Sequence, residues 1–215
     1  GFSAVRMSMA RPDVRIATLE VDPVHVIIAR NIVAFAGLSH AINIWTGHSK
    51  EVIPCITDYH MGDGMVPFNA VFMDQRGSRY EEDLMALEDK ALLSPGAVVV
   101  ADNVLKPGAP LFLWHVITSC AYKTQIIRVR EFTMPSEDWM TVSTFRPHQA
   151  VSGGKEGGTT RGRCAPPPQL LELHRESDRM RERAKGPRGV TFAEWAAFAD
   201  RARRCLASVG IAPTS

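Results

Sequence analysis

The sequence predicts an α/β fold: an open, mostly parallel sheet with an antiparallel edge strand, followed by a helical tail. First, apolar strand-like runs alternate with segments of helical periodicity over the first 120 residues, which is typical of right-handed βαβ units. Second, the strand-like runs at 123–132 and 139–145 have no helix between them, which predicts an antiparallel pair at one edge. Third, a Gly- and Pro-rich break follows residue 150.

The individual elements follow from hydrophobic period and turn signals. Strands are expected at residues 14–21, 41–45, 68–74, 97–102, 123–132 and 139–145. Asp22 followed by Pro23 is a typical helix start, and Gly37 is a typical helix end. Helices are expected at residues 22–35, 49–60, 79–93 and 109–120, with Pro54 absorbed inside the second of them.

Composition divides the chain into three parts. We predict a domain over residues 1–150, a Gly/Pro-rich linker over 151–168 and a helical extension over 169–215. From residue 152 onward the chain has 12 Lys and Arg against 7 Asp and Glu. Such a basic tail can contact acidic partners or RNA. Its apolar residues at helical spacing favour the simpler interpretation of solvated helices that pack one apolar face on the domain.

Overall composition narrows the class of protein. Hydrophobic residues make up 45% of the chain and charged residues 22%, which are globular values, and a net charge of +2 gives no clear nucleic-acid partner. The four cysteines have no metal-binding or paired spacing, which favours reduced thiols and an intracellular, cytoplasmic location. No apolar run reaches the length of a membrane span, so we predict no membrane segment in this chain. We also predict that the protein is a monomer.

Acidic residues stand at the ends of three predicted strands. Glu20 closes the first strand, Asp74 the third, and Asp102-Asn103 the fourth. Ligands of open α/β sheets bind beyond the carboxyl ends of the strands, and an acid at the position of Glu20 is typical of a ribose-binding residue. The oxygens of the other three residues suit Mg²⁺, and the absence of His and Cys from the group argues against zinc.

Several stretches of the chain resemble a known family. They are TLEVDP, ARNIVAFAGL, TGHSKEVIP, FNAVFMD and RYEEDLMALEDKALLSPGAVVVADNVLKPGAP, within a match that runs from residue 1 to about residue 145. These stretches resemble the catalytic domain of the catechol O-methyltransferase family. The resemblance implies a Rossmann-like methyltransferase fold. It also implies methyl transfer from S-adenosyl-L-methionine to a hydroxyl of a small catechol-like diol chelated to Mg²⁺.

The resemblance assigns cofactor-binding roles to residues of the first half of the chain. Gly1 and Ser3 match the end of the family's glycine-rich loop, where Ser3 would hold the methionine carboxylate at a helix N-terminus. Glu20 matches the ribose acid, and Ser49 matches a serine near the adenine.

The resemblance also assigns metal and substrate roles. Asp74, Asp102 and Asn103 match the protein ligands of Mg²⁺, and Asp74 also lies in the cofactor-binding segment. Pro107 matches a proline that walls the catechol slot, and Asn103 is expected to contact the substrate too. Glu131 matches a catalytic acid that hydrogen-bonds the second catechol hydroxyl.

Two positions depart from the family pattern. The family's general-base lysine, three residues after the metal aspartate, is replaced by Gly77, and Lys106 is our candidate for a substitute. The aromatic residue expected beside the adenine is replaced by Arg76, whose guanidinium plane can stack on a base. The loss of the lysine supports an alternative hypothesis, a non-catalytic methyltransferase-like binding or scaffold protein. An RNA methyltransferase aided by the basic tail is a third hypothesis.

The match begins after the family's central first strand. Its omission would leave the edges of two neighbouring strands unpaired. We therefore expect the 215 residues to be part of a longer chain or an incomplete gene product.

Overall fold

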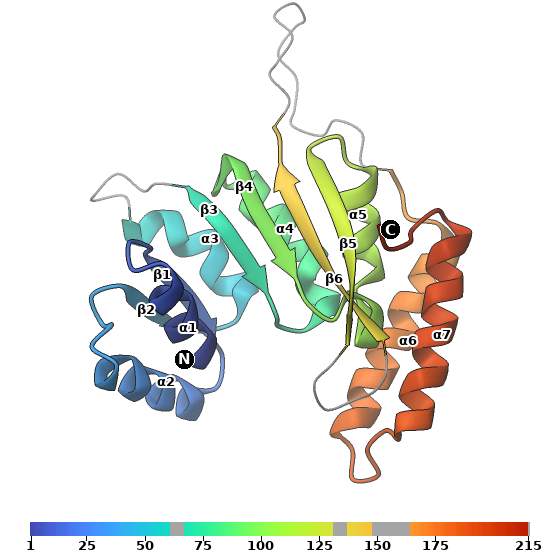
Figure 1. Ribbon diagram of the computed structural model, residues 1–215, viewed down its shortest axis with the longest axis horizontal. Helices are drawn as coiled ribbons and strands as arrows, with labels where there is room; N and C mark the ends of the chain where they lie inside the picture. Colours follow the sequence, from blue (N-terminus) through green and yellow to red (C-terminus); the bar gives the residue numbers. More distant parts are fainter. Residues whose placement is uncertain (61–66, 131–136, 148–163, 215) are drawn as a thin grey trace, which may run out of the picture. The chain divides into compact units, whose positions relative to one another are not determined.

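The computed structural model describes residues 1–60, 67–130, 137–147 and 164–214 (Figure 1). The chain forms two compact units, residues 1–65 and residues 66–215. Most of the predicted linker, residues 148–163, lies outside the described residues. The predicted boundaries at residues 150 and 168 stay a prediction.

The first unit packs helices on a two-stranded parallel sheet. Its elements are α1 (Phe2–Ala10), β1 (Ile16–Glu20), α2 (Pro23–Phe35), β2 (Ile42–Thr46) and α3 (Ser49–His60). The register of the sheet pairs Ile16 with Ile42 and Glu20 with Thr46. The predicted cap of α2 is confirmed, because the Asp22 side chain accepts hydrogen bonds from the backbone N–H groups of Val24 and His25.

The second unit contains a four-stranded mixed sheet. Its elements up to the sheet's last strand are β3 (Phe68–Met73), η1 (Gly77–Arg79), α4 (Tyr80–Asp89), β4 (Leu93–Ala101), η2 (Val104–Gly108), α5 (Pro110–Thr118), β5 (Tyr122–Arg130) and β6 (Glu137–Phe145). Figure 1 shows the strands side by side in the order β3-β4-β6-β5, with α4 and α5 behind them. Strands β3 and β4 are parallel, whereas β6 is antiparallel to both of its neighbours. The described strands β1 and β3 each pair with a neighbour on one side only.

The antiparallel strand is not at the edge, and the sequence-based prediction is wrong on this detail. Strand β6 pairs with β4 on one side and with β5 on the other, so β5 is the edge strand. The side chains give the reason. Strand β5 exposes charged residues such as Lys123 and Arg130, which suit an edge, whereas β6 buries Trp139, Thr141 and Ser143. The antiparallel pair itself and the α/β class are as predicted.

Helix α4 is shorter than the sequence predicts. It ends at Asp89 because Ala91 adopts a left-handed conformation with φ of 52°, and the N–H of Leu92 bonds back to the carbonyl of Leu87. Leu92 and Leu93, expected in the helix, are buried and lead into β4.

The predicted tail helices are α6 (Pro168–Lys185) and α7 (Phe192–Ser208), and they pack against each other. Helix α7 begins with a capping box, because Thr191 and Glu194 exchange side-chain and backbone hydrogen bonds. One apolar face of each helix is buried, through Leu170, Leu173 and Met180 in α6 and Phe198, Ala199, Ala202 and Leu206 in α7. Figure 1 shows the helix pair beside β5 and β6. The interpretation of the tail as helices with one packed face is confirmed.

The end of the chain returns to the sheet. The backbone N–H of Thr214 donates to the carbonyl of Ile126 on β5 over 2.9 Å. The hydroxyl of Thr214 accepts from the N–H of the same residue over 3.1 Å. The C-terminal segment therefore pairs with the edge strand.

Candidate functional site

The carboxyl ends of β3 and β4 bring two aspartates together. Met73 and Ala101 are register partners, and the N–H of Asp102 donates to the carbonyl of Met73 over 3.0 Å. Asp74 and Asp102 each follow this last pair, so the two carboxyl groups stand on adjacent strands. Asp74 is exposed at the surface, yet its partial burial raises its pKa, and the negative charge of Asp102 raises that pKa further. A bound cation would offset this repulsion.

Asn103 is held beside these aspartates by a buried carboxylate that the sequence-based reasoning missed. Its backbone is left-handed, with φ of 53°, and its N–H donates to Asp102 over 2.8 Å. Its side-chain Nδ2 donates to Asp138 over 3.2 Å, which leaves the amide oxygen as the atom available to a cation. The only signal in the sequence was an acidic residue just before the buried Trp139.

Tyr80 lies against the same group of acids. The buried phenol donates to the backbone carbonyl of Asp102 over 3.2 Å and packs edge-on against Phe112. Burial raises its pKa, and the charges of Asp74, Asp102 and Asp138 raise it further. Tyr80 is therefore a neutral hydrogen-bond donor at neutral pH.

The donor set at these strand ends fits Mg²⁺. Two carboxylates and one amide oxygen are hard ligands that leave positions open in an octahedral shell. A divalent ion would offset the unfavourable negative charge that raises the pKa of Asp74. Within the described part of the chain, no group of three His, Cys, Asp or Glu side chains is placed to hold a metal ion. A site here therefore depends on the amide oxygen of Asn103 as third ligand.

Four of the residues predicted to bind the cofactor lie in the first unit, namely Gly1, Ser3, Glu20 and Ser49. Gly1 is the N-terminal cap residue of α1, so Ser3 lies in the first turn of a helix, as expected. Glu20 is the last residue of β1 and accepts a hydrogen bond from the N–H of Asp22 over 3.0 Å. Ser49 is the first residue of α3. Their binding roles stay predictions.

The two candidates for proton transfer are placed differently. Lys106 is only 2% exposed, and its backbone N–H donates to Asp138 over 3.0 Å. It is followed in η2 by Pro107, the predicted wall of the substrate slot. Glu131 lies outside the described residues. The assignment of Lys106 as a base stays a prediction.

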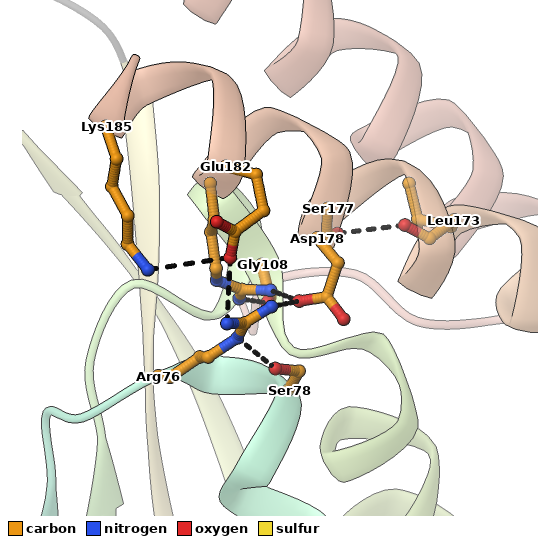
Figure 2. A network of polar contacts seen from close by, with 9 residues as sticks. Arg76, Ser78, Gly108, Leu173, Ser177, Asp178, Glu182 and Lys185 are labelled. Atoms are coloured by element: carbon orange, nitrogen blue, oxygen red, sulfur yellow. Dashed lines mark hydrogen bonds and ion pairs between the residues drawn. The ribbon is translucent and has the colours of Figure 1, made fainter.

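Arg76 is engaged by the tail helix α6. Figure 2 shows its guanidinium between Asp178 and Glu182, at distances of 3.1 and 2.9 Å, and its Nε donating to Ser78 over 2.9 Å. Burial opposes ionisation of Asp178. The hydrogen bonds from Arg76 and Ser78, with the charges of Arg76 and Arg181, outweigh it and lower the pKa of Asp178. The predicted stacking of Arg76 on adenine stays a prediction, and it would have to coexist with these contacts.

Gly77 is buried, and its surroundings leave no room for a side chain. A Cβ atom added to it would lie 2.5 Å from an Arg181 guanidinium nitrogen and 2.8 Å from the carbonyl oxygen of Gly108. A guanidinium nitrogen of Arg181, from α6, therefore lies where a side chain at position 77 would begin.

Similarity to solved structures shows the fold. The structure is similar to that of the O-methyltransferase TomG from Streptomyces achromogenes in complex with SAM. The TM-score is 0.59 and the identity 24%, covering 68% of this chain and 69% of that one. An O-methyltransferase from Bacillus cereus gives a TM-score of 0.52 at 17% identity, covering 61% and 63%. These similarities show the fold, a Rossmann-like methyltransferase fold, as predicted.

Sequence similarity defines the family. Residues 1–133 match the model of the O-methyltransferase family, and the chain belongs to that family. Catechol O-methyltransferase of Sus scrofa is 40% identical over 117 residues, which are 54% of this chain and 61% of that one. Catechol O-methyltransferase B of Danio rerio is 33% identical over 146 residues, 67% and 54% of the two chains. The chain thus spans about half to three-fifths of the length of these relatives.

Two further findings concern disulfide bonds and membrane-spanning helices. The four cysteines form no disulfide bond. Among the described helices, none has both the length and the apolar character needed to cross a bilayer.

Replacing Gly77 with alanine is expected to lower the free energy of unfolding by about 1–3 kcal/mol, because the added methyl group would press on the Gly108 carbonyl. Urea titration measures this change. Gly186→Ala is the matched control, since the added carbon there stays 3.3 Å from its nearest neighbour, the Arg183 carbonyl. Equal losses in the two variants would show that Gly77 is not constrained by its surroundings.

Asp74→Asn is expected to raise the midpoint of thermal unfolding at pH 7 by about 1–3 °C without divalent metal. The raised pKa means that ionising Asp74 costs stability. This cost is absent below the unfolded-state pKa and is fully present above the folded-state pKa. The gain should therefore vanish near pH 3. Circular dichroism melts at both pH values measure it, and a variant less stable than the wild type at pH 7 contradicts it.

Proposed function

We propose that the protein transfers a methyl group from S-adenosyl-L-methionine to a hydroxyl of a catechol-like diol held at a Mg²⁺ site. The observation that carries the proposal is the pairing of Asp74 with Asp102 at adjacent strand ends, with the amide oxygen of Asn103 oriented by Asp138. Membership of the O-methyltransferase family and 40% identity to a catechol O-methyltransferase support it.

Asp74, Asp102 and Asn103 would hold the ion. When bound, Mg²⁺ lowers the pKa of a chelated hydroxyl and fixes the position of its oxygen. Asp138 keeps the amide of Asn103 in one orientation, and the Tyr80 hydroxyl stays protonated against the Asp102 carbonyl. The chain's task is then to hold the diol in one orientation, because alignment of the reacting atoms supplies much of the rate.

Other residues would bind the two reactants. Glu20 would accept hydrogen bonds from the ribose hydroxyls, and the first turn of α1 with Ser3 would bind the methionine carboxylate. Pro107 would form one wall of the diol slot. The proton that leaves the reacting hydroxyl needs an acceptor. Gly77 has no side chain that could accept it, so Glu131 and Lys106 are the candidates.

A non-catalytic binding protein of the same fold is the second candidate function. The observation that favours it is Gly77, where the lysine of the resembling family is absent and Arg181 lies where a side chain would begin. Such a protein would bind S-adenosyl-methionine without transferring its methyl group.

The first experiment is transfer of a radiolabelled methyl group from S-adenosyl-methionine to a simple catechol, with Mg²⁺ and then with EDTA. We expect transfer that EDTA abolishes and that Asp102→Asn lowers by at least about 100-fold, because a metal ligand is lost. Asp13→Asn is the control, since Asp13 is exposed and paired only locally with Arg11. Transfer that persists in EDTA would disprove the metal-dependent mechanism, and no transfer with Mg²⁺ would favour the binding protein.

Glu20→Gln is expected to weaken binding of S-adenosyl-methionine by about 10- to 100-fold, because hydrogen bonds from the ribose to a charged group become bonds to a neutral one. Isothermal titration calorimetry measures the change. Glu51→Gln is the control, since Glu51 is exposed and pairs with the neighbouring Lys50. An unchanged affinity in Glu20→Gln would remove Glu20 from the cofactor site.

A further inference from the structure

The tail helix α6 contacts both turns that follow the proposed metal-binding strand ends. It packs against η1, the turn after β3, and against η2, the turn after β4. The ion pairs from Arg76 to Asp178 and Glu182 join residues that are 102 and 106 positions apart in the sequence. Figure 2 shows α6 lying over Ser78 and Gly108 at this junction.

Arg181 is a side chain of α6 that lies between the two turns. It is only 9% exposed, and its guanidinium donates to the carbonyl of Gly108 in η2 and, over 3.0 Å, to Asp178. The same guanidinium occupies the space that a Cβ of Gly77, in η1, would need. One buried arginine therefore spans the gap between the two turns.

Both turns have glycine at the point of contact, and the structure gives a reason for each. A side chain on Gly77 would collide with Arg181 and the Gly108 carbonyl. Gly108 has φ of 97°, and an added Cβ would lie 3.2 Å from the hydroxyl of Ser177 on α6. The two glycines thus allow the backbone of both turns to approach α6 closely.

A second link shares a carboxylate with the first. Asp178 accepts from Arg181 and also from Arg76, which precedes Gly77. A buried guanidinium requires such a charged partner. Because Asp178 binds both arginines, the position of α6 and the positions of the two turns depend on one another.

We infer that Arg181 is a positioning residue that clamps the turn after β3 to the turn after β4, and so fixes Asp74 relative to Asp102 and Asn103. The inference rests on the proposed function for its effect on metal binding. The tail helix is then part of the site. Its arginine lies where a side chain at Gly77 would begin, and it acts through the backbone rather than by taking a proton.

The test compares Arg181→Lys and Arg181→Met with Arg179→Lys in the full chain. Lysine keeps the charge but loses the planar fork that reaches two acceptors. Arg179 is on the same helix, 64% exposed, and bonds to Glu172 on α6 itself, so its replacement is the matched control. Amide hydrogen exchange is measured for segments 77–79 and 104–109, and for β4 and β6 as a check that the fold is intact.

We expect both Arg181 variants to exchange at least about 10-fold faster in the two turns, with β4 and β6 unchanged. Exchange at the wild-type rate in the turns of Arg181→Lys would overturn the clamp. This readout needs neither metal nor activity.

Mn²⁺ binding, followed by the loss of the free-ion electron paramagnetic resonance signal, is the second readout. We expect about 10-fold weaker binding in both Arg181 variants and none of this loss in Arg179→Lys. Tighter binding in Arg181→Met would show that Arg181 acts only as a repelling charge, and it would overturn the inference. If the wild type binds no Mn²⁺, the proposed metal site fails, while the exchange rates still decide the clamp.

Discussion

The buried carboxylate of Asp138 is the interaction on which the candidate site depends. It is fully buried, and its Oδ1 accepts from the N–H groups of Leu105, Lys106 and Trp139, while its Oδ2 accepts from Asn103. A buried carboxylate is tolerated only when it is hydrogen-bonded in this way. Because these donors come from η2 and from the start of β6, one side chain fixes the turn after β4 to the neighbouring strand.

The ends of β3 and β4, which carry the candidate metal ligands, also carry a local electrostatic cost. Asp74 and Asp102 lie at adjacent strand ends, and partial burial together with the negative charge of Asp102 raises the pKa of Asp74. Such unfavourable charge pairs are typical of sites that bind a ligand of opposite sign, where stability is exchanged for function. The turn after β4, which Asp138 holds in place, supplies the rigidity that keeps the two aspartates close together in the folded protein.

Local signals in the sequence were sufficient for much of the fold. The cap at Asp22 and the bounds of α3 were predicted because each depends on residues close together in the chain. The acids at the ends of β3 and β4 were found for the same reason, since a strand end is visible in the sequence and parallel pairing places such ends together.

The features that the sequence did not reveal depend on distant residues. Strand β6 lies between β4 and β5 because it, rather than β5, tolerates a neighbouring strand on both edges. The role of Asp138 can be recognised only once η2 is seen to fold onto β6, the strand that carries this residue. Gly77 looked like the loss of a functional lysine, and only the return of α6 shows that the glycine accommodates Arg181.

The pairing of Thr214 with Ile126 has a consequence for how the protein behaves at high concentration. Strand β5 ends the sheet, and the outward N–H and carbonyl of Ile126 would otherwise be free to pair with a strand of another molecule. Thr214 occupies these groups and so hinders edge-to-edge association at this point of the strand. Removing the segment around Thr214 would therefore expose these groups and change colloidal stability, even though no residue of the proposed site is touched.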